Sequence, residues 1–451
     1  MKRRNPVFAV TLAALLLAAG SAAWAQEEEP FYFWRWGHMD GPHDSSMAFG
    51  ISRDGKTAVG STLVVDFERA WRSDIEWAIA TDDGVPPLYN ELQVQEDIGV
   101  IAPSRPSAAY AASDMLTEPS GYDLPNLQLD WGGSTAVGTY VLGTVSYSIQ
   151  WLLPVLDSVD EGDFVAIPDF GGGLADMAAL GVTADGLIMV GYGNTKRGHM
   201  AFYADMTDPL LPVVKQLTIQ DAVTLQTLRS SSAEAVSADG TIIAGYGSTK
   251  KANRAFVTTV VDASTDPITL ESVILPMLGG GKFAEAYAMT PDGAIIAGRS
   301  DSPKGPVACI WFQDLTQTDA PWVIKELGAL AKKTKNAVAT GIAYRPGSAV
   351  GELMVVGYSN TVLYGSEAIV WTGNPVLEDD EIGYFYDLEY ILTKTGAGEL
   401  SGMGSSWILY EATGISAAGD RIVGWGVNPE GGIEAWVVTG FPFDELEFTH
   451  E

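Results

Sequence analysis

The sequence predicts an all-β fold, a β-propeller of seven four-stranded blades closed by the N-terminal strand. The first observation is a repeat, because a short strand, a turn and a second strand ending in Val-Gly or Ala-Gly recur seven times. The second is an aromatic residue that follows each of these glycines by eleven to fourteen positions. The third is composition: 50 glycines and almost no long helical periodicity favour short strands joined by tight turns.

The spacing of the repeat fits propeller blades. Successive glycines at the end of the second strand lie 53 to 78 residues apart, which leaves room for four short antiparallel strands in each unit. The second and sixth units lack the Asp-Gly turn, so their boundaries are the least defined. The seven glycines are Gly60, Gly138, Gly191, Gly245, Gly298, Gly357 and Gly424.

The fourth unit shows how one blade is expected to fold. Strands are predicted over residues 233–237, 241–245, 255–261 and 268–275, with the first turn at Asp239-Gly240. Asp-Gly suits a two-residue hairpin turn in which both central residues adopt positive φ. We therefore expect the recurring aspartates to serve the backbone of the turns rather than catalysis. They are Asp54, Asp185, Asp239 and Asp292.

The recurring aromatic residues are expected in the core, packed between neighbouring blades where glycine allows a close approach. They are Trp71, Trp151, Phe202, Phe256, Trp311, Trp371 and Trp436. Residues 31–37, Phe-Tyr-Phe-Trp-Arg-Trp-Gly, stand where an interior unit has its fourth strand, with no strands before them. We therefore predict that this segment pairs with the last unit, closes the ring and covers an exposed edge.

The first 25 residues predict a secretory signal peptide. Lys2, Arg3 and Arg4 precede an apolar stretch over 7–20, and Ala-Trp-Ala at 23–25 is typical of a cleavage site. A retained N-terminal anchor is the alternative, although the stretch is short for a membrane span. The remaining residues 26–451 are expected to form one exported propeller domain, outside the cell or in the periplasm, with no further membrane span.

The charge is strongly acidic, with 26 basic and 57 acidic residues and a net charge of −31. Removing the three basic residues of the signal leaves 23 − 57 = −34. This charge argues against nucleic acid and anionic membranes as partners, because binding to phosphate requires Lys and Arg. A soluble monomer is expected. Divalent cations such as Ca²⁺, or a basic partner, are the alternatives that the charge leaves open.

Cys309 is the single cysteine, so the chain contains no internal disulfide framework. It lies in an apolar strand and is expected to be a buried, unreactive thiol. Two units carry extra residues, at roughly 72–128 and 372–411, and a short surface helix is expected over 386–392. Since insertions in repeat arrays often carry binding, these two segments are the first candidates for a functional surface.

Three segments resemble the HAF-repeat family of bacterial extracellular proteins. Residues 275–281 (Leu-Pro-Met-Leu-Gly-Gly-Gly) and 327–330 (Leu-Gly-Ala-Leu) resemble the link of that family, and residues 407–426 resemble its long terminal unit. The resemblance extends over essentially the whole chain after the signal peptide. It implies a propeller-like fold and export from a bacterium, and it implies no reaction and no catalytic residues.

One cluster has the composition of a metal site. His38, Asp40, His43 and Asp44 combine imidazole and carboxylate groups that could share a Zn²⁺ ion. The same segment aligns with the glycine-rich links of other units, so a simple blade connection is the alternative. No other cofactor is expected, since the glycine-rich segments lack the Lys-Ser/Thr and the helix of a phosphate loop.

The sequence favours a non-catalytic binding module whose partner is an unknown protein or glycan. It contains no nucleophile elbow in an α/β context, so an enzyme is not supported by motif. The alternative is a hydrolase or lyase that acts on an extracellular polymer such as a glycan, with carboxylates converging at the central channel. A channel lined by small and apolar side chains would favour a binding or structural role, whereas a rim of carboxylates from different blades would favour the enzyme.

Overall fold

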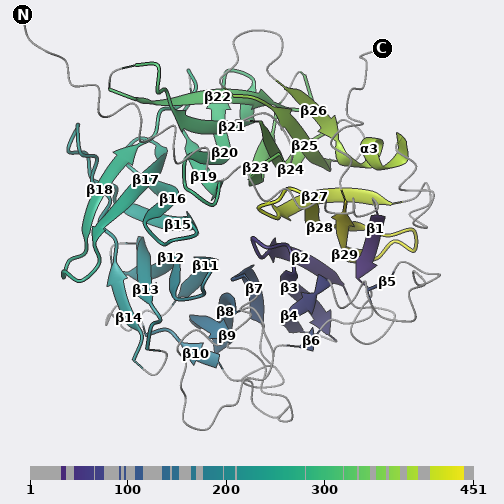
Figure 1. The fold of residues 1–451 in the computed structure, drawn as a ribbon, viewed down its shortest axis with the longest axis horizontal. Helices are drawn as coiled ribbons and strands as arrows, with labels where there is room; N and C mark the ends of the chain where they lie inside the picture. The colour runs from purple at the N-terminus through teal and green to yellow at the C-terminus, as the bar shows by residue number, and fades with distance from the viewer. Residues whose placement is uncertain are drawn as a thin grey trace, which may run out of the picture.

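A computed structural model of the chain describes the repeat region in nineteen segments. They are residues 32–36, 45–64, 67–75, 91–92, 96–97, 107–114, 135–142, 145–151, 164–168, 176–196, 198–208, 211–279, 281–317, 319–332, 335–345, 352–361, 365–375, 383–394 and 407–440. These residues form seven antiparallel sheets around a common centre, and each sheet is one blade (Figure 1). The predicted all-β, seven-bladed propeller is confirmed.

The blades follow one another in chain order, each with its innermost strand first. Blade 1 contains β2 (Ser46–Ile51), β3 (Thr57–Val64), β4 (Phe67–Asp74) and β6 (Glu96–Asp97). Blade 2 contains β7 (Ser107–Ala112), β8 (Ala136–Leu142), β9 (Val145–Trp151) and β10 (Phe164–Ala166). Blade 3 contains β11 (Met177–Val182), β12 (Ile188–Thr195), β13 (Gly198–Asp205) and β14 (Val213–Gln216). Blade 4 contains β15 (Ser230–Val236), β16 (Ile242–Ser248), β17 (Asn253–Asp262) and β18 (Thr269–Ile274).

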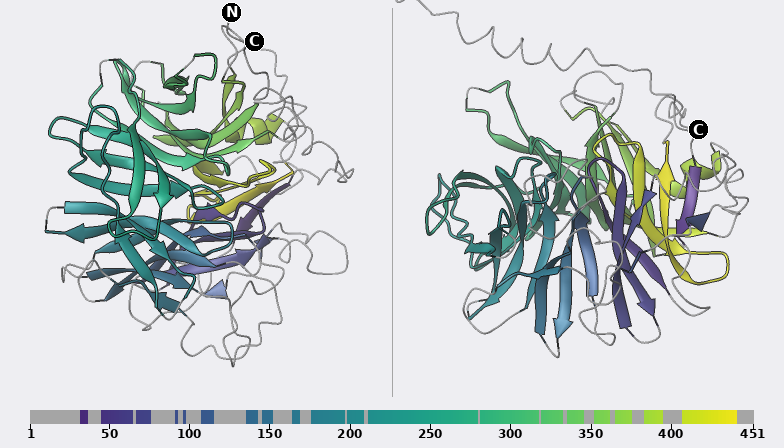
Figure 2. Two further views of the ribbon diagram at one scale, coloured as in Figure 1. Left: turned by 60° about the vertical axis from the view of Figure 1, so that its left-hand side comes forward. Right: turned by 60° about the horizontal axis from the view of Figure 1, so that its bottom comes forward.

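The remaining blades complete the ring. Blade 5 contains β19 (Ala284–Met289), β20 (Ile295–Ser302), β21 (Gly305–Gln313) and β22 (Trp322–Gly328). Blade 6 contains β23 (Ala337–Tyr344), β24 (Leu353–Asn360), β25 (Ser366–Gly373) and β26 (Tyr384–Asp387), followed by helix α3 (Leu388–Lys394). Blade 7 contains β27 (Ile408–Ile415), β28 (Arg421–Val427), β29 (Ile433–Thr439), β1 (Tyr32–Trp36) and β5 (Glu91–Leu92). Figure 2 shows the sheets side by side around the same centre from two further directions.

The ring is closed by the N-terminal strand, as the sequence predicts. β1 pairs antiparallel with β29, from Tyr32 opposite Thr439 to Arg35 opposite Trp436. The ring of Phe33, whose residue is 2% exposed, lies 5.3 Å from that of Trp407 and 6.3 Å from that of Trp436. The short strand β5 adds parallel to β1 and gives this blade a fifth strand, which the sequence does not indicate.

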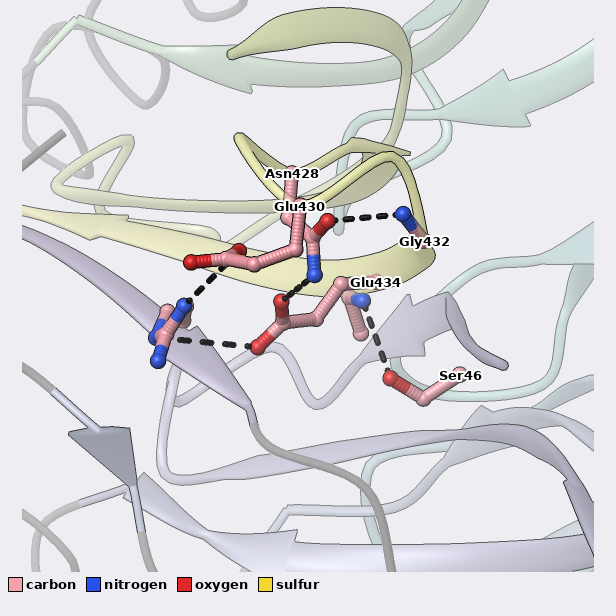
Figure 3. Close-up of polar contacts among 7 residues, drawn as sticks. Ser46, Asn428, Glu430, Gly432 and Glu434 are labelled. Atoms are coloured by element: carbon pink, nitrogen blue, oxygen red, sulfur yellow. Dashed lines mark hydrogen bonds and ion pairs between the residues drawn. The ribbon is translucent and has the colours of Figure 1, made fainter. Parts of the chain in front are cut away.

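A polar network fastens β1 to the last blade and the last blade to the first (Figure 3). Arg35 of β1 faces two carboxylates, with Nη1 3.5 Å from Glu430 and Nε 3.9 Å from the buried Glu434. Asn428 Nδ2 donates to Glu434 at 2.7 Å, so this carboxylate is not left without partners. Ser46 of blade 1 accepts a hydrogen bond from the backbone N–H of residue 435 at 3.1 Å.

The Asp-Gly turns differ from the expectation in one respect. In the first unit the turn closes when Gly55 N–H donates to the Ser52 carbonyl at 3.0 Å, so residues 53 and 54 are the central pair. Only Gly55 has positive φ, at 74°, whereas Asp54 does not. The Asp54 carboxylate accepts hydrogen bonds from Ser52 Oγ and from the N–H of Lys56. These are four-residue turns with the glycine last, and the aspartates stabilise them as predicted.

The glycine of each Val-Gly or Ala-Gly pair faces a β-bulge in the innermost strand of its own blade. In all seven blades the register shifts by one residue opposite this glycine. A Cβ atom at these glycines would lie 1.9–2.1 Å from a carbonyl oxygen of the innermost strand. Glycine is therefore required within the blade. We expected this glycine to allow a close approach between neighbouring blades. It allows instead a close approach to the innermost strand of its own blade.

Six of the seven recurring aromatic residues are core residues, as predicted, and the side chain of Trp151 lies outside the described part of the structure. Trp71, Phe202, Phe256, Trp311 and Trp436 are 0% exposed and Trp371 is 1% exposed. The described part of the second insertion also belongs to the core. Residues 388, 391 and 392 of α3 are buried in one cluster with Phe33 and Trp407. The helix is shorter than expected at its start, since residues 386 and 387 belong to β26, and its apolar side packs against the closing blade.

We predict that Phe33→Ala lowers the free energy of unfolding by about 3–5 kcal/mol, because it leaves a cavity between two tryptophans at the closing strand. Chemical denaturation followed by tryptophan fluorescence measures the change. Val261→Ala, at a side chain that is 60% exposed, is the matched control and should change the stability by less than about 0.5 kcal/mol. Equal stability of the two variants would contradict closure by β1.

Candidate functional site

A channel cavity of about 160 Å³ lies at the centre of the ring. All seven innermost strands contribute to its wall, which consists mostly of small and apolar residues such as Gly50, Ala111, Val182, Ala288 and Ile342. Among the described lining residues, Arg53 is the single basic residue and Glu234 the single acidic one. The described wall of the channel thus carries one carboxylate, while the charges of Asp114, Asp185 and Asp239 act on Arg53 at one end of it.

The bulges decide which side chains are directed toward the centre. A bulge places one extra residue in a strand and re-aims its side chain, which is why bulges are frequent near functional sites. Five of the bulge residues line the channel cavity: Tyr110, Glu234, Tyr287, Thr340 and Thr413. The remaining two are Phe49 and Leu180. The same backbone position thus carries a different side chain in almost every blade.

Arg53 closes the end of the channel at which the Asp-Gly turns lie, which we call the turn end. Its Nη2 donates to the carbonyl of Val236 at 2.6 Å, from blade 1 to blade 4. Burial lowers the pKa of Arg53, and the charges of Asp114, Asp185 and Asp239 oppose this shift. The guanidinium of Arg53 therefore has a structural role, since it donates to the Val236 carbonyl and interacts with the charges of these three carboxylates.

Hydrogen bonds between neighbouring turns brace this end of the ring. The N–H of one turn donates to the carbonyl of the equivalent residue in the next blade. Four such hydrogen bonds, of 2.7–3.3 Å, run from Asp114 to Ala184, from Ala184 to Ala238, from Ala238 to Pro291 and from Ala417 to Arg53. Pro291 has no N–H and cannot continue the series.

The opposite end, where β16 leads into β17 and the blades are linked, is the link end. Here a partly buried ion pair joins two strands of blade 5, with Arg299 Nη2 of β20 2.6 Å from Glu285 Oε2 of β19. Tyr287 donates its hydroxyl to the same oxygen at 2.6 Å, and Asn253 Nδ2 lies 3.3 Å from the other oxygen. Burial and the bond to Glu285 both raise the pKa of Tyr287, so its hydroxyl remains protonated. Glu285 is thus fully partnered.

Glu234, at the bulge of β15, has different surroundings. Its Oε1 accepts a hydrogen bond from Ser232 Oγ at 2.5 Å, and within the described part of the chain its Oε2 has no hydrogen-bond partner. Burial raises the pKa of Glu234 to about 7, the Ser232 bond opposes the shift, and the charge of Glu285 adds to it. A carboxyl group poised near neutral pH lies at the wall of the channel.

A second cavity, which we call the rim cavity, adjoins Glu234 at the link end between blades 3 and 4. Its volume is about 270 Å³, close to the lower limit of roughly 300 Å³ for ligand pockets. Two partly exposed tyrosines, an exposed histidine, serines and one asparagine dominate its lining. The lining residues are Tyr192, His199, Ser230, Ser231, Ser232, Tyr246, Gly247, Ser248 and Asn253.

Residues of five strands, β12, β13, β15, β16 and β17, set the geometry of the rim cavity. The ring of Tyr192 on β12 meets that of His199 on β13 edge to face at 4.9 Å. The ring of Tyr246 on β16 meets that of Tyr287 at 5.9 Å in the same manner. Burial, followed by the charges of Glu234 and Glu285, raises the pKa of Tyr246 to about 12. Both tyrosines are therefore neutral hydroxyl groups at physiological pH.

Four of the residues singled out from sequence are not placed by the structure. His38, Asp40, His43 and Asp44 lie outside the described residues. Among the residues that are described, no group of three or more His, Cys, Asp or Glu could hold a metal ion. Cys309 is buried in β21, as expected, and burial raises the pKa of its thiol. No helix within the described segments is long and apolar enough to cross a membrane.

The sequence analysis missed Glu234 and the two tyrosines of the rim cavity. A usable indication was present, because the residue directly after the repeat glycine is Tyr in three units, at positions 192, 246 and 358. This position pairs with the start of the third strand, at the link end of the blade. Glu234 had no comparable indication, since the bulge that directs it follows from backbone geometry rather than from residue type.

Comparisons with known proteins leave the function open. No family model matches the chain, and no curated protein sequence matches it. Among solved structures, an oligogalacturonate lyase from Vibrio parahaemolyticus aligns with 91% of this chain and 97% of its own, at 9% identity and a TM-score of 0.48. Prolyl oligopeptidase B from Galerina marginata aligns with 85% of this chain, at 12% identity and a TM-score of 0.45.

TolB from Acinetobacter baumannii aligns with 74% of this chain, at 11% identity and a TM-score of 0.33. The chain spans 47% of the length of the peptidase and 61% of that of TolB. Similarities this weak support no transfer of activity or partner. The resemblance to HAF repeats likewise stays a prediction.

We predict that Glu234 makes stability depend on pH. A pKa near 7 in the folded protein, against 4.5 for an ordinary glutamate, means that the native state holds a proton which the unfolded state has released. The stabilising contribution of Glu234 to the free energy of unfolding is therefore complete below pH about 4.5 and is lost as the pH rises toward 7. Between these values it should decrease by about 2–3 kcal/mol at most.

The measurement is the unfolding free energy of the wild type minus that of Glu234→Gln, at intervals from pH 4 to pH 8. The subtraction removes the other carboxyl groups with raised pKa, such as Asp387 and Glu389. A difference that does not change with pH would show that Glu234 titrates normally.

Proposed function

We propose that this chain is an exported, non-catalytic binding module that holds a glycan at the link end of the propeller, in the rim cavity. The observation that carries the proposal is the pairing of partly exposed tyrosine rings with serine and asparagine side chains in one depression. The predicted signal peptide and the resemblance to HAF repeats support the export. The net charge of −31 is consistent with a soluble protein outside the cell.

The lining of the rim cavity suits the chemistry of a sugar. A pyranose ring presents a face of C–H groups, which packs against an aromatic ring, and an edge of hydroxyl groups, which needs donors and acceptors. Tyr192 and Tyr246 offer the aromatic faces, while Ser230, Ser248 and Asn253 offer hydroxyl and amide groups at the same depression. Ser230 and Ser248 share a hydrogen bond of 2.6 Å and Asn253 donates to Glu285 at 3.3 Å, but hydroxyl and amide groups keep further donor and acceptor capacity for the hydroxyl groups of a sugar.

The channel supports binding rather than catalysis on a polymer. Its volume of about 160 Å³ is well below the roughly 300–1,000 Å³ that ligand pockets occupy. Arg53 extends across the turn end from blade 1 to the carbonyl of Val236 in blade 4, which narrows this end of the channel. Glycoside cleavage requires a pair of carboxyl groups across the scissile bond, and the described wall of the channel provides Glu234 alone.

We predict that Tyr246→Ala weakens binding of the recognised glycan at least tenfold, because about 1.4 kcal/mol of stacking is lost. Tyr246→Phe keeps the ring and should retain most of the affinity. The purified chain without its signal is applied to an array of cello-, chito-, manno- and xylo-oligosaccharides, and the affinity for each bound sugar is measured by calorimetry.

Tyr390→Ala is the matched control, since this tyrosine is 49% exposed on helix α3, away from the rim cavity. It should bind as the wild type does. Absence of binding to every oligosaccharide, or equal weakening by Tyr390→Ala and Tyr246→Ala, would refute a glycan site in the rim cavity.

A further inference from the structure

We infer that the glycan carries a free amine and that Glu234 receives the resulting ammonium group at the inner end of the rim cavity. This inference rests on the proposed glycan site and identifies the class of sugar: a saccharide with unacetylated amino groups. It is argued from the contacts of Glu234, the tyrosines around it and the position of Ser232.

The carboxylate of Glu234 has no cationic partner in the described part of the chain. Arg299 is the basic residue of the adjacent blade, and it is bound to Glu285 through both Nη2 and Nε, at 2.6 and 2.7 Å. Arg53 lies at the turn end and donates to a backbone carbonyl. An anionic group that lacks a counter-ion inside a low-dielectric site favours a cationic ligand.

Glu285 and Glu234 differ in the partners of their carboxylate oxygens, and only Glu234 has an oxygen available for a ligand. Glu285 accepts from Arg299, Tyr287 and Asn253, so both of its oxygens are occupied. Glu234 accepts only from Ser232, at one oxygen. An ammonium group donates up to three hydrogen bonds, and Glu234 Oε2 is the acceptor that the described contacts leave open.

Aromatic rings add to the preference for a cation. Tyr246 and Tyr192 both experience the charge of Glu234, and Tyr246 lies against Tyr287, which lines the channel beside Glu234. Ammonium groups are attracted to the faces of such rings, by roughly 0.5–2 kcal/mol according to desolvation. A carboxylate among tyrosines therefore selects an organic ammonium over a neutral group of the same size.

Ser232 connects this acceptor to the proposed sugar site. Ser232 lines the rim cavity, and its hydroxyl donates to Glu234. Glu234 itself lines the channel cavity, so an amino group that extends past Ser232 from a sugar in the rim cavity meets this carboxylate. The channel cavity of about 160 Å³ has room for an amino group and a few water molecules, each of which occupies about 30 Å³, rather than for a second sugar ring.

Binding of an ammonium group should also release a proton. A cation beside Glu234 favours the ionised carboxyl group, so a group that is partly protonated at pH 6.5 loses its proton when the ligand binds. The titratable groups around Glu234 are Tyr192 of β12, Tyr246 of β16 and Glu285 of β19, whose charges interact with it, and Tyr287 of β19, which lines the channel with it. His199 of β13 lines the rim cavity itself. Glu234→Gln, which keeps all of these groups, therefore tests whether Glu234 is the source of the proton.

The probes are the β-1,4-linked tetramer of glucosamine, its fully N-acetylated counterpart and the tetramer of glucose. We expect the wild type to bind the amine tetramer at least tenfold more tightly than the acetylated one. Glu234→Gln should abolish this preference and leave the affinity for the acetylated tetramer unchanged. Calorimetry at pH 6.5 in two buffers of different ionisation enthalpy should detect proton release by the wild type and none by the variant.

Glu411→Gln is the matched control, because Glu411 is a partly buried glutamate on β27 across the ring and its loss changes the net charge equally. It should keep the preference, which separates local recognition from general attraction to an acidic protein. Melting temperatures verify that the variants fold, and Glu234→Asp, which keeps the charge but shortens the reach, should show an intermediate preference.

Three results would overturn the inference. Equal affinity for the amine and acetylated tetramers, or a preference that persists in Glu234→Gln, refutes the ammonium site while the proposed glycan site stands. Failure of all three tetramers to bind, together with a negative oligosaccharide array, refutes the proposed function and this inference with it.

Discussion

The close approach of the repeat glycine to a bulged innermost strand is the constraint on which the rest of the structure depends. Any Cβ atom at Gly60 or its six equivalents would collide with a carbonyl about 2 Å away, so the bulge and the glycine require each other. The bulge increases the local twist. In five of the seven blades the bulge also places an extra residue in the lining of the channel. Blade geometry and channel chemistry thus have one origin.

The fold could be predicted because its determinants are local and repeated. The Ser/Thr-x-Asp-Gly turns, the glycine and the buried aromatic residue recur in most units, so the period of the sequence reports the architecture directly. The closing strand was predictable for the same reason, since 31–37 has the composition of a missing fourth strand. The addition of β5 was not, because a two-residue strand has no pattern of its own.

The candidate site could not be predicted in the same way. Glu234 occupies a position that holds Phe, Tyr, Leu or Thr in other blades, and nothing in its local sequence shows that the side chain faces a channel. Its chemistry follows from a neighbour in another blade, since Arg299 satisfies Glu285 and leaves Glu234 without a counter-ion. The partners of Glu234 thus distinguish its unit from the others, whereas a repeat in the sequence shows only the features that the units have in common.

The two insertions were the first candidates for function because they interrupt the repeat. In the second insertion, however, helix α3 packs Leu388, Ile391 and Leu392 into the closing blade. A hydrophobic stripe beside the seam stabilises the join where β1 meets β29. Conversely, the rim cavity is built entirely from regular strand ends. Among the described residues, a substitution within the repeat frame, Glu234, thus places a carboxyl group with a raised pKa at the wall of the channel.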